Sequence, residues 1–590
     1  MLDAPLLSTA ALANQSLSSS GKITLLSSSS TAVAAPTDLG GNLNLDAASF
    51  SADSAIILPS GMLNIRARSG DITLNHRIDV SGRTLNYNDA QRSTAGGTIQ
   101  LQADNGSITL AATSDLRLNG VDQAGTLDLS AARGSVQLLG KLQADGNQSG
   151  QFRLDVATLT HTAATDAALN QGGFHHLRSL RVRQGNVNVD GNSQSSSYQL
   201  SADQGSIVVD GSIDASGRVG GSIALHATGD LTLSSSARLS VKGETFRNSG
   251  KGGDILLAAG SQTAGQVGTG WLDAQAGAVL DLSVSAFVEG DALTSGSSAS
   301  KGQFTGSLHL RAPQFSNGSD LQMRNIAATI LQASLVQIEG YRLYDLSAGS
   351  GVITSTIQST VRSDAQTFLG AAGASPTETQ TQWRSRLFAN RSDVDVRWVI
   401  SPGAEIINRN GDLTLGTTSS TNTSDWDLST YRFGSSSAAG LLTLRASGIL
   451  TFYNALSDGF ASSAQSARLL TQNSALPINA QSWSYQLAAG ADFSSALPSA
   501  TLGSDSLAST SGHVQLGKNN GTNISNSNGS NNPAGFNALT TSAVSNRFQV
   551  IRTGSGNISV HTGRSIRLLN EFATIYTCLL YTSPSPRDRG

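Results

Sequence analysis

The chain has 590 residues, of which 38% are hydrophobic, 5% aromatic and 13% charged, and its formal net charge is −3. This near-neutral charge, with basic residues that are dispersed instead of clustered, argues against nucleic-acid binding and against a disordered polyelectrolyte. The only cysteine is Cys578, so neither a disulfide framework nor a thiolate metal site is expected.

The N-terminal residues 1–5 lack the basic and apolar regions of a signal peptide. No apolar run approaches the ~20 residues that a membrane span requires. We therefore expect either a cytosolic protein or a piece of a longer one, and the two ends of the chain favour the piece. Residues 1–60, which are rich in serine and alanine, are predicted to form irregular early coils.

A turn–strand unit recurs from residue 61 onward. Each unit has a glycine, a small polar residue and a short run with aliphatic residues at alternate positions, as in residues 69–74, 105–110 and 133–138. A fixed period in the twenties is typical of a stacked solenoid. Four of the turn glycines are spaced 24 residues apart: Gly205, Gly229, Gly253 and Gly277.

The physical chemistry of this unit predicts a parallel β-helix over residues 61–315. Glycine allows the positive φ of a tight corner, and the polar residue after it can fix that corner through a hydrogen bond. The alternating aliphatics point to one face of a strand, which is buried only when successive coils stack in parallel. Longer spacings place extra residues in loops, such as Asn86–Asp89 and the pair His175 and His176. A β-sandwich would not keep the same short unit over hundreds of residues.

Between residues 316 and 400 the pattern fails, and a small helical excursion is predicted near 350–390. Ile353, Ile357, Val361 and Phe368 fall on one helical face. This excursion is expected to pack against the flank of the solenoid.

A second helix is expected to start at Ser375. Ser375 would be its N-cap, Pro376 its first residue and Glu378 the residue three positions after the cap. Trp383 and Leu387, four residues apart, would share its buried face.

The repeat resumes over residues 401–577. A polar loop at 519–537 interrupts it and is expected to be mobile. Residues 578–590 change character abruptly, and we interpret them as a non-native tail that resembles translated sequencing adapter. The true protein would then continue past residue 577 with a different sequence.

Several segments together resemble the filamentous haemagglutinin family of large bacterial exoproteins. Their order and the solenoid period carry the likeness, which covers most of 61–577 and is strongest after 320. The matching segments are Gly340–Leu346, Pro402–Asn408, Asn410–Leu415, Trp426–Ser429, Ala455–Phe460 and Ile551–Ile558.

The resemblance implies a right-handed β-helical shaft that is secreted by the two-partner route and displayed on, or shed from, a Gram-negative surface. Its implied partners are an outer-membrane secretion pore, acting through a region absent here, and receptors or glycans on host or neighbouring cells. The chain departs from the family pattern because it lacks the N-terminal signal and secretion domain. No functional residue is transferred, since the shaft has no established catalytic set.

Three clusters could carry chemistry, and each also has an ordinary structural interpretation. His175 and His176 are adjacent and have no ligand partner at metal spacing, so a loop pair is favoured over a metal site. Gly252, Gly253 and Asp254 resemble one calcium-binding nonapeptide, but the tandem series is missing. No catalytic residue, cofactor or metal ligand is therefore predicted.

The best enzyme candidate is the segment Asp393–Arg397. Its alternation would place Asp393 and Asp395 on one strand face beside Arg397, as in the acidic grooves of β-helical lyases and pectinases. The same pattern describes a half-exposed strand with its valines inward, and we favour that interpretation.

The leading functional hypothesis is a non-enzymatic shaft segment of a secreted adhesin. One alternative is the stalk of a contact-dependent inhibition toxin, and another is a β-helical carbohydrate-active enzyme. Because an open-ended piece of solenoid exposes unpaired strand edges, residues 61–577 alone are expected to self-associate.

Overall fold

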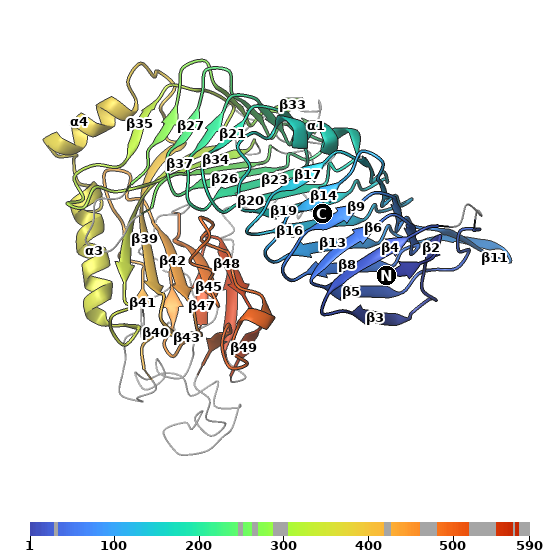
Figure 1. Ribbon diagram of the computed structural model, residues 1–590. Helices are drawn as coiled ribbons and strands as arrows, with labels where there is room; N and C mark the ends of the chain where they lie inside the picture. The colour runs from blue at the N-terminus through green and yellow to red at the C-terminus, as the bar shows by residue number, and fades with distance from the viewer. Residues whose placement is uncertain are drawn as a thin grey trace. The chain divides into compact units, whose positions relative to one another are not determined.

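The computed structural model contains two compact units, which are described separately (Figure 1). Unit 1 comprises Met1–Ala259, Leu272–His309 and Ile326–Leu335, and unit 2 comprises Gly260–Trp271, Leu310–Asn325 and Val336–Gly590. The structure describes residues 1–28, 33–245, 252–261, 269–286, 305–417, 426–460, 481–517, 550–569 and 573–577.

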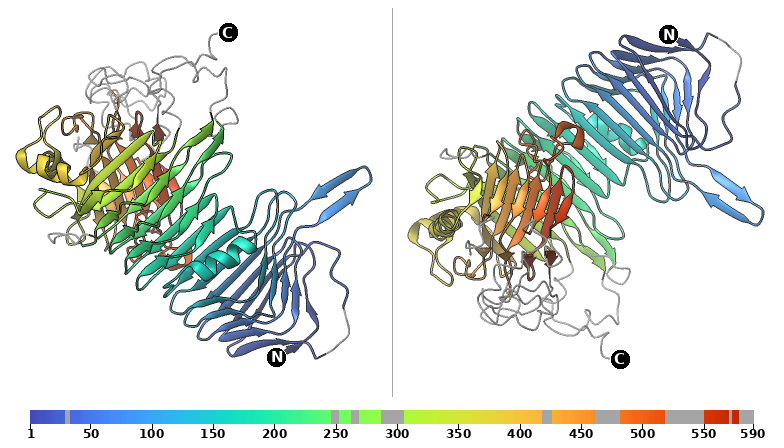
Figure 2. Two further views of the ribbon diagram at one scale, coloured as in Figure 1. Left: turned by 90° about the horizontal axis from the view of Figure 1, so that it is seen from above. Right: turned by 90° about the horizontal axis from the view of Figure 1, so that it is seen from below.

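Unit 1 is a parallel β-helix, which confirms the predicted fold class. Each coil contributes a longer strand to one wall (the long wall), then a short strand to a second wall and a short strand to a third wall (Figure 2). Strands of successive coils pair in parallel and in register, so that Leu43, Leu63, Ile99 and Leu127 form one buried interior column.

The strands of unit 1 follow the three walls. The long wall contains β3 Asn14–Ser18, β5 Asn42–Ala47, β8 Met62–Ala67, β13 Thr98–Ala103, β16 Thr126–Ala131, β19 Gln151–Val156, β20 Leu177–Val182, β23 Ser197–Ala202, β26 Ser222–Ala227 and β30 Asp254–Ala258. The second wall contains β1 Leu2–Asp3, β4 Lys22–Leu26, β6 Ser49–Ala52, β9 Ile72–Leu74, β14 Ile108–Leu110 and β17 Val136–Leu138, and then β21 Val187–Val189, β24 Ile207–Val209, β27 Leu231–Leu233 and β31 Leu272–Ala274. The third wall contains β2 Leu6–Leu7, β7 Ala55–Ile57, β10 Arg77–Asp79, β15 Asp115–Arg117 and β18 Lys141–Gln143, and then β22 Asn192–Gln194, β25 Ser212–Asp214, β28 Arg238–Ser240, β32 Val279–Asp281 and β36 Thr329–Leu331. A short separate pair is formed by β29 Gly243–Thr245 and β33 Val284–Ala286.

Two predictions about unit 1 are wrong. Residues 1–60 are not irregular, because β1 to β7 already pair in register within all three walls. The 24-residue spacing is not the coil length either: coils run from 20 residues (Leu177 to Ser197) to 53 residues (Asp254 to Ser307). Of the equally spaced glycines, Gly205 and Gly229 precede second-wall strands, whereas Gly253 precedes a long-wall strand and Gly277 a third-wall strand.

The role predicted for the turn glycines also needs correction. Gly185 and Gly277 have positive φ, but Gly106 and Gly205 do not. A Cβ atom at Gly106 would overlap the carbonyl oxygen of Gly70 in the preceding coil, and one at Gly205 would overlap that of Gly185. At these corners glycine is required because the backbones of consecutive coils approach closely, not because of an unusual backbone conformation.

Two excursions leave the coils of unit 1. Helix α1 (Ala163–Gln171) packs between β18 and β22, where a third-wall strand would otherwise lie. The predicted loop at 86–89 is the tip of an antiparallel hairpin, β11 (Thr84–Tyr87) and β12 (Ala90–Ser93), which projects from the coils (Figure 2).

Unit 2 repeats the same three-walled coil. Its long wall contains β37 Leu335–Asp345, β39 Trp398–Asn408, β42 Leu441–Ala446, β45 Ser484–Ala489 and β48 Ile558–Thr562. Its second wall contains β38 Val352–Ile353, β40 Leu413–Leu415, β43 Leu450–Phe452, β46 Val514–Leu516 and β49 Ile566–Leu568. Its third wall contains β41 Trp426–Asp427, β44 Leu456–Ser457, β47 Val550–Thr553 and β50 Thr574–Thr577, and one 3₁₀ turn lies at Ser504–Ser506.

The helical excursion is confirmed, with different boundaries. Helix α3 (Ser355–Leu369) is capped by Thr354, so Ile353 lies in β38 and not on the helix. The region 316–400 is also less interrupted than predicted, since it holds the 11-residue strand β37.

Helix α4 (Glu378–Leu387) begins two residues later than predicted. Its N-cap is Thr377, and Thr377 and Gln380 form a reciprocal capping box. Trp383 and Leu387 are both buried as expected. The Trp383 ring stacks on Phe368 of α3 with ring centroids 5.4 Å apart. The predicted polar loop at 519–537 and the predicted tail at 578–590 lie outside the described residues.

Candidate functional site

The acidic segment Asp393–Arg397 is not a strand. It is a turn that precedes β39, and Val396 is 93% exposed, so the expected inward valines are wrong. The Asp395 carboxylate is 2.7 Å from Arg397, and the Asp393 carboxylate is 2.6 Å from Arg391. Hydrogen bonds from these arginines lower the pKa of each aspartate. Both carboxylates therefore stay ionised near neutral pH, which does not suit a general acid.

The other two clusters have structural partners. His175 Nδ1 lies 3.0 Å from the carbonyl oxygen of Gln194, and His176 Nε2 lies 2.8 Å from Gln148 Nε2, so the pair occupies a coil corner as expected. Gly252 and Gly253 lead directly into β30, and both face backbone atoms of neighbouring coils. Throughout the described ranges, His, Cys, Asp and Glu side chains nowhere gather in threes as a metal site requires.

The segments that carry the family resemblance meet inside unit 2. Gly340 pairs with Pro402 and Tyr341 with Gly403 across β37 and β39. Further along, Trp426 pairs with Leu456, and Leu456 pairs with Ile551 in the third wall. Equivalent positions of successive coils are thus occupied by different segments, and their side chains build the core.

The largest group of buried charges in the described part of unit 2 joins β34 (Ser307–Pro313), β37, β39 and β42. Arg311 donates to Glu339 at 3.2 Å and to Glu405 at 2.7 Å. Arg445 donates to Glu405 at 3.1 Å and to the carbonyl oxygen of Asp492 at 3.1 Å. The Arg311 guanidinium also lies 3.7 Å from the centre of the Tyr341 ring.

This network balances two arginines, Arg311 and Arg445, against two glutamates, Glu339 and Glu405. Burial alone would raise the pKa of the Glu405 carboxyl, but the charges of Arg311 and Arg445 outweigh burial and hold that pKa below its usual value. The pair of arginines therefore keeps the carboxylate ionised inside the protein. The arrangement can lock neighbouring coils together, because its ion pairs join β34, β37, β39 and β42.

This network was not predicted from the sequence. Glu405 lies within the resemblance segment Pro402–Asn408, and Arg445 follows an alternating run of leucines. Both are recognisable as charged residues within strands. Their pairing is not recognisable, because it depends on contacts between residues 40 to 94 positions apart.

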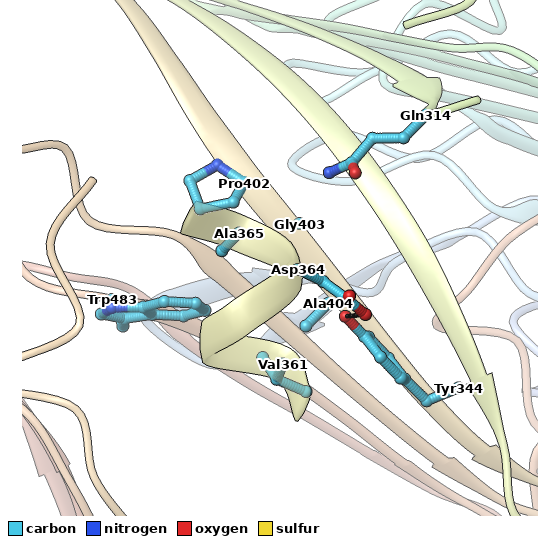
Figure 3. Close-up of a pocket in the computed structure, with 9 residues that line it drawn as sticks. All are labelled: Gln314, Tyr344, Val361, Asp364, Ala365, Pro402, Gly403, Ala404 and Trp483. Atoms are coloured by element: carbon cyan, nitrogen blue, oxygen red, sulfur yellow. Dashed lines mark hydrogen bonds between the residues drawn. The ribbon is translucent and has the colours of Figure 1, made fainter. Parts of the chain in front are cut away.

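A small cavity lies between α3 and β39 (Figure 3). Its volume is about 10 Å³, which is room for at most one water molecule. At its edge the Tyr344 hydroxyl donates to Asp364 at 3.0 Å. The cavity is too small for a substrate. It is lined by Gln314, Tyr344, Val361, Asp364, Ala365, Pro402, Gly403, Ala404 and Trp483.

The β11–β12 hairpin is the candidate contact surface. Its strands are joined by the two-residue turn Asn88–Asp89, which follows the paired residue Tyr87, and Tyr87 is 56% exposed. Its base is fixed to the coils, because the Thr94 hydroxyl bonds to the backbone of Arg83 at 2.8 Å and lies 2.6 Å from the Ser60 hydroxyl. A projecting element with a rigid base can reach a partner without disturbing the core.

Comparison of the chain with protein-family models, with curated proteins and with solved structures finds no match. Among the described residues, no helix is both long and apolar enough to cross a membrane.

The buried charges predict that unit 2 loses stability in acid. The pKa of the Glu405 carboxyl is lower in the folded state than in the unfolded chain, where it is about 4.3 for glutamate. Its ionisation therefore stabilises the fold fully above the unfolded pKa, and this stabilisation is lost as the pH falls through the folded pKa. We expect the urea concentration at the unfolding midpoint to decrease once the pH is lowered below about 4.5. Glu405→Gln should weaken this pH dependence of stability and should also lower stability at pH 7. All five tryptophans lie in unit 2, so their fluorescence reports this unit alone.

The matched control is Asp395→Asn, which removes an exposed ion pair from the turn before β39. Its stability should change by less than about 1 kcal/mol at either pH. An unchanged acid slope in Glu405→Gln would contradict the proposed role of the network.

Proposed function

We propose that this chain is a non-enzymatic shaft segment of a secreted, surface-displayed bacterial adhesin of the filamentous haemagglutinin type. The observation that carries the proposal is the three-walled stacking of coils in both units, in which the resemblance segments form core strands. A stacked solenoid suits reach and display, because its length grows with each coil while its core stays thin.

The surface chemistry supports the same proposal. The Asp393–Arg397 turn has its carboxylates paired with arginines, and the cavity beside α3 has room for about one water molecule. The hairpin β11–β12 instead offers exposed backbone edges, an exposed tyrosine and amide side chains at Asn86 and Gln91. Such groups favour contact with another cell surface over turnover of a bound substrate.

The proposal predicts that the purified chain binds host or bacterial cell surfaces saturably and that this binding needs the hairpin. Residues 84–93 can be replaced by Asn-Gly, since Thr94 already donates to the Arg83 carbonyl at 2.8 Å and a two-residue turn closes such a pair. We expect binding of the labelled chain to cells to fall at least tenfold, with an unchanged unfolding midpoint.

Leu139→Ser is the matched control, because it changes an exposed residue elsewhere on unit 1 and should leave binding intact. Full binding without the hairpin would place the contact elsewhere on the chain. Absence of binding to any cell surface, or release of oligosaccharides from pectin or alginate, would contradict the proposed function.

A further inference from the structure

Arg384 on helix α4 differs from the other arginines of that helix and of the turn after it. Arg386, Arg391 and Arg397 each pair with an aspartate at 2.6 or 2.7 Å. Within the described part of the chain Arg384 forms no ion pair and donates no hydrogen bond, although its Nε atom is buried. Burial lowers the pKa of its guanidinium, and no neighbouring charge offsets this effect. Because a buried charge without a partner is costly, this position is suited to an anion from outside the chain.

A second donor without an acceptor lies beside Arg384. Trp383 is only 3% exposed, and across the described ranges its indole N–H has no hydrogen-bond partner. The centre of its ring is 5.3 Å from the guanidinium carbon of Arg384. Indole and guanidinium nitrogens donate hydrogen bonds and accept none. The two neighbouring side chains therefore favour a ligand group that only accepts.

The turn Gly434–Ser437 lies against the guanidinium and adds more donors. A Cβ atom built on Gly434 would be 3.7 Å from Arg384 Nη2. The three serines of the turn are exposed, and none of their hydroxyls has a partner among the described residues. The backbone N–H groups of Ser435 and Ser436 likewise meet no acceptor in that part of the chain. Turns with free N–H groups are known anion-binding elements.

Groups within the chain do not supply the missing negative charge. The acidic residue of α4, Glu378, accepts from Gln382 at 3.4 Å instead. The C-terminal end of α3 is close, since the Leu369 carbonyl oxygen would be 3.2 Å from a Cβ atom on Gly434. A helix C-terminus carries only about half a negative charge, which is shared by its last carbonyls. The site therefore keeps a surplus of positive charge.

We propose that Trp383, Arg384 and the Gly434–Ser437 turn bind the carboxylate of a sugar acid. One carboxylate balances one guanidinium, and the planar fork of arginine matches it with two parallel hydrogen bonds. The serine hydroxyls can both donate to and accept from the hydroxyls of a sugar ring. The turn has no apolar side chain, so a sugar fits it better than a peptide with hydrophobic residues. The site belongs to unit 2 and the hairpin to unit 1, and the inference does not rest on the proposed function.

The test titrates sodium glucuronate into the full 590-residue chain and measures the heat of binding by isothermal titration calorimetry. Glucuronate should bind saturably, with an affinity that falls as salt is added, and glucose, which lacks the carboxylate, should not bind. Arg384→Gln should weaken glucuronate binding at least about tenfold. Replacing Ser435 and Ser436 together with alanine should weaken glucuronate binding and leave the weaker binding of acetate unchanged.

The matched control is Arg397→Gln, which removes an arginine that already has a carboxylate partner and should bind glucuronate like the unmodified chain. Since Arg384 has no partner to lose, Arg384→Gln should keep the urea unfolding midpoint, which circular dichroism checks. Equal weakening in both arginine variants would show attraction to surface charge only and overturn the proposal. Acetate binding as tight as that of glucuronate would overturn the assignment to a sugar, and tighter binding of N-acetylaspartate would overturn it in favour of an acidic peptide. A lack of glucuronate binding would overturn the site itself.

Discussion

Replacing Arg178 with methionine is expected to destabilise unit 1 by about 3–5 kcal/mol, the largest effect of any single change we predict. Arg178 is fully buried in the interior column, where Phe152 and Tyr198 occupy the equivalent positions of the adjacent coils. Its guanidinium donates to Asn170 at 2.6 Å and forms an ion pair with Asp166 at 3.3 Å. Without it, the buried Asp166 carboxylate of α1 loses its counter-charge.

A double-mutant cycle with Asp166→Asn isolates this coupling. Burial raises the pKa of the Asp166 carboxyl, so the charged form is already costly, and Asp166→Asn should cost less than the arginine change. The double variant should be more stable than the sum of the single effects implies. Urea unfolding followed by far-UV circular dichroism measures the free energy of unfolding of the unmodified chain, of each single variant and of the double variant. Additive effects would contradict the pairing.

Arg183 provides the matched control directly after the same strand. It pairs with Asp155 at 2.6 Å, and both side chains are partly exposed. Arg183→Met should cost no more than about 1 kcal/mol, since surface ion pairs contribute little. A similar cost for both arginine variants would mean that burial of Arg178 does not decide its importance.

The interior columns could be predicted from the sequence because the period of two is a local property of each strand. Leu180 and Val182 mark the inward face of β20, and the same alternation places Arg178 inside. The sequence could not show why a cation is tolerated there. That reason lies in α1, which supplies Asp166 and Asn170 from a segment with no strand pattern.

Two patterns that the sequence leaves ambiguous at the local level also needed correction. Residues Ser375–Glu378 and Thr377–Gln380 both fit a capping pattern, and local propensity does not choose between them. The structure selects Thr377, because the Gln380 side chain also donates to the carbonyl oxygen of Phe368 at 3.1 Å. Likewise, the alternation in Asp393–Arg397 suggested a strand, but its carboxylates pair with arginines two residues away and the segment turns.

The second large prediction concerns the glycines at the coil corners. It distinguishes two reasons why glycine is needed there: close approach of the backbones of two coils, or a backbone conformation with positive φ. Gly106→Ala should destabilise unit 1 by about 2–3 kcal/mol, because the added methyl group would overlap the Gly70 carbonyl and force two coils apart. Gly21 occupies the corresponding corner before β4, where the nearest atom to an added Cβ is Ser19 Oγ at 4.0 Å. Gly21→Ala should therefore be neutral, or slightly stabilising because it restricts the unfolded chain.

Gly185→Ala completes the comparison, since this glycine has φ of 80° and open space around a built Cβ. Its cost should be about 1–2 kcal/mol and should arise from the left-handed conformation alone. Urea unfolding by circular dichroism ranks the three variants, and hydrogen exchange should show faster exchange in β9 and β14 for Gly106→Ala only. If the Gly21 and Gly106 variants were equally stable, contact between coils would not be what selects glycine at these corners. If instead only Gly106→Ala speeds hydrogen exchange in β9 and β14, direct contact between the backbones of neighbouring coils sets their distance, and this contact is what requires glycine at the corner.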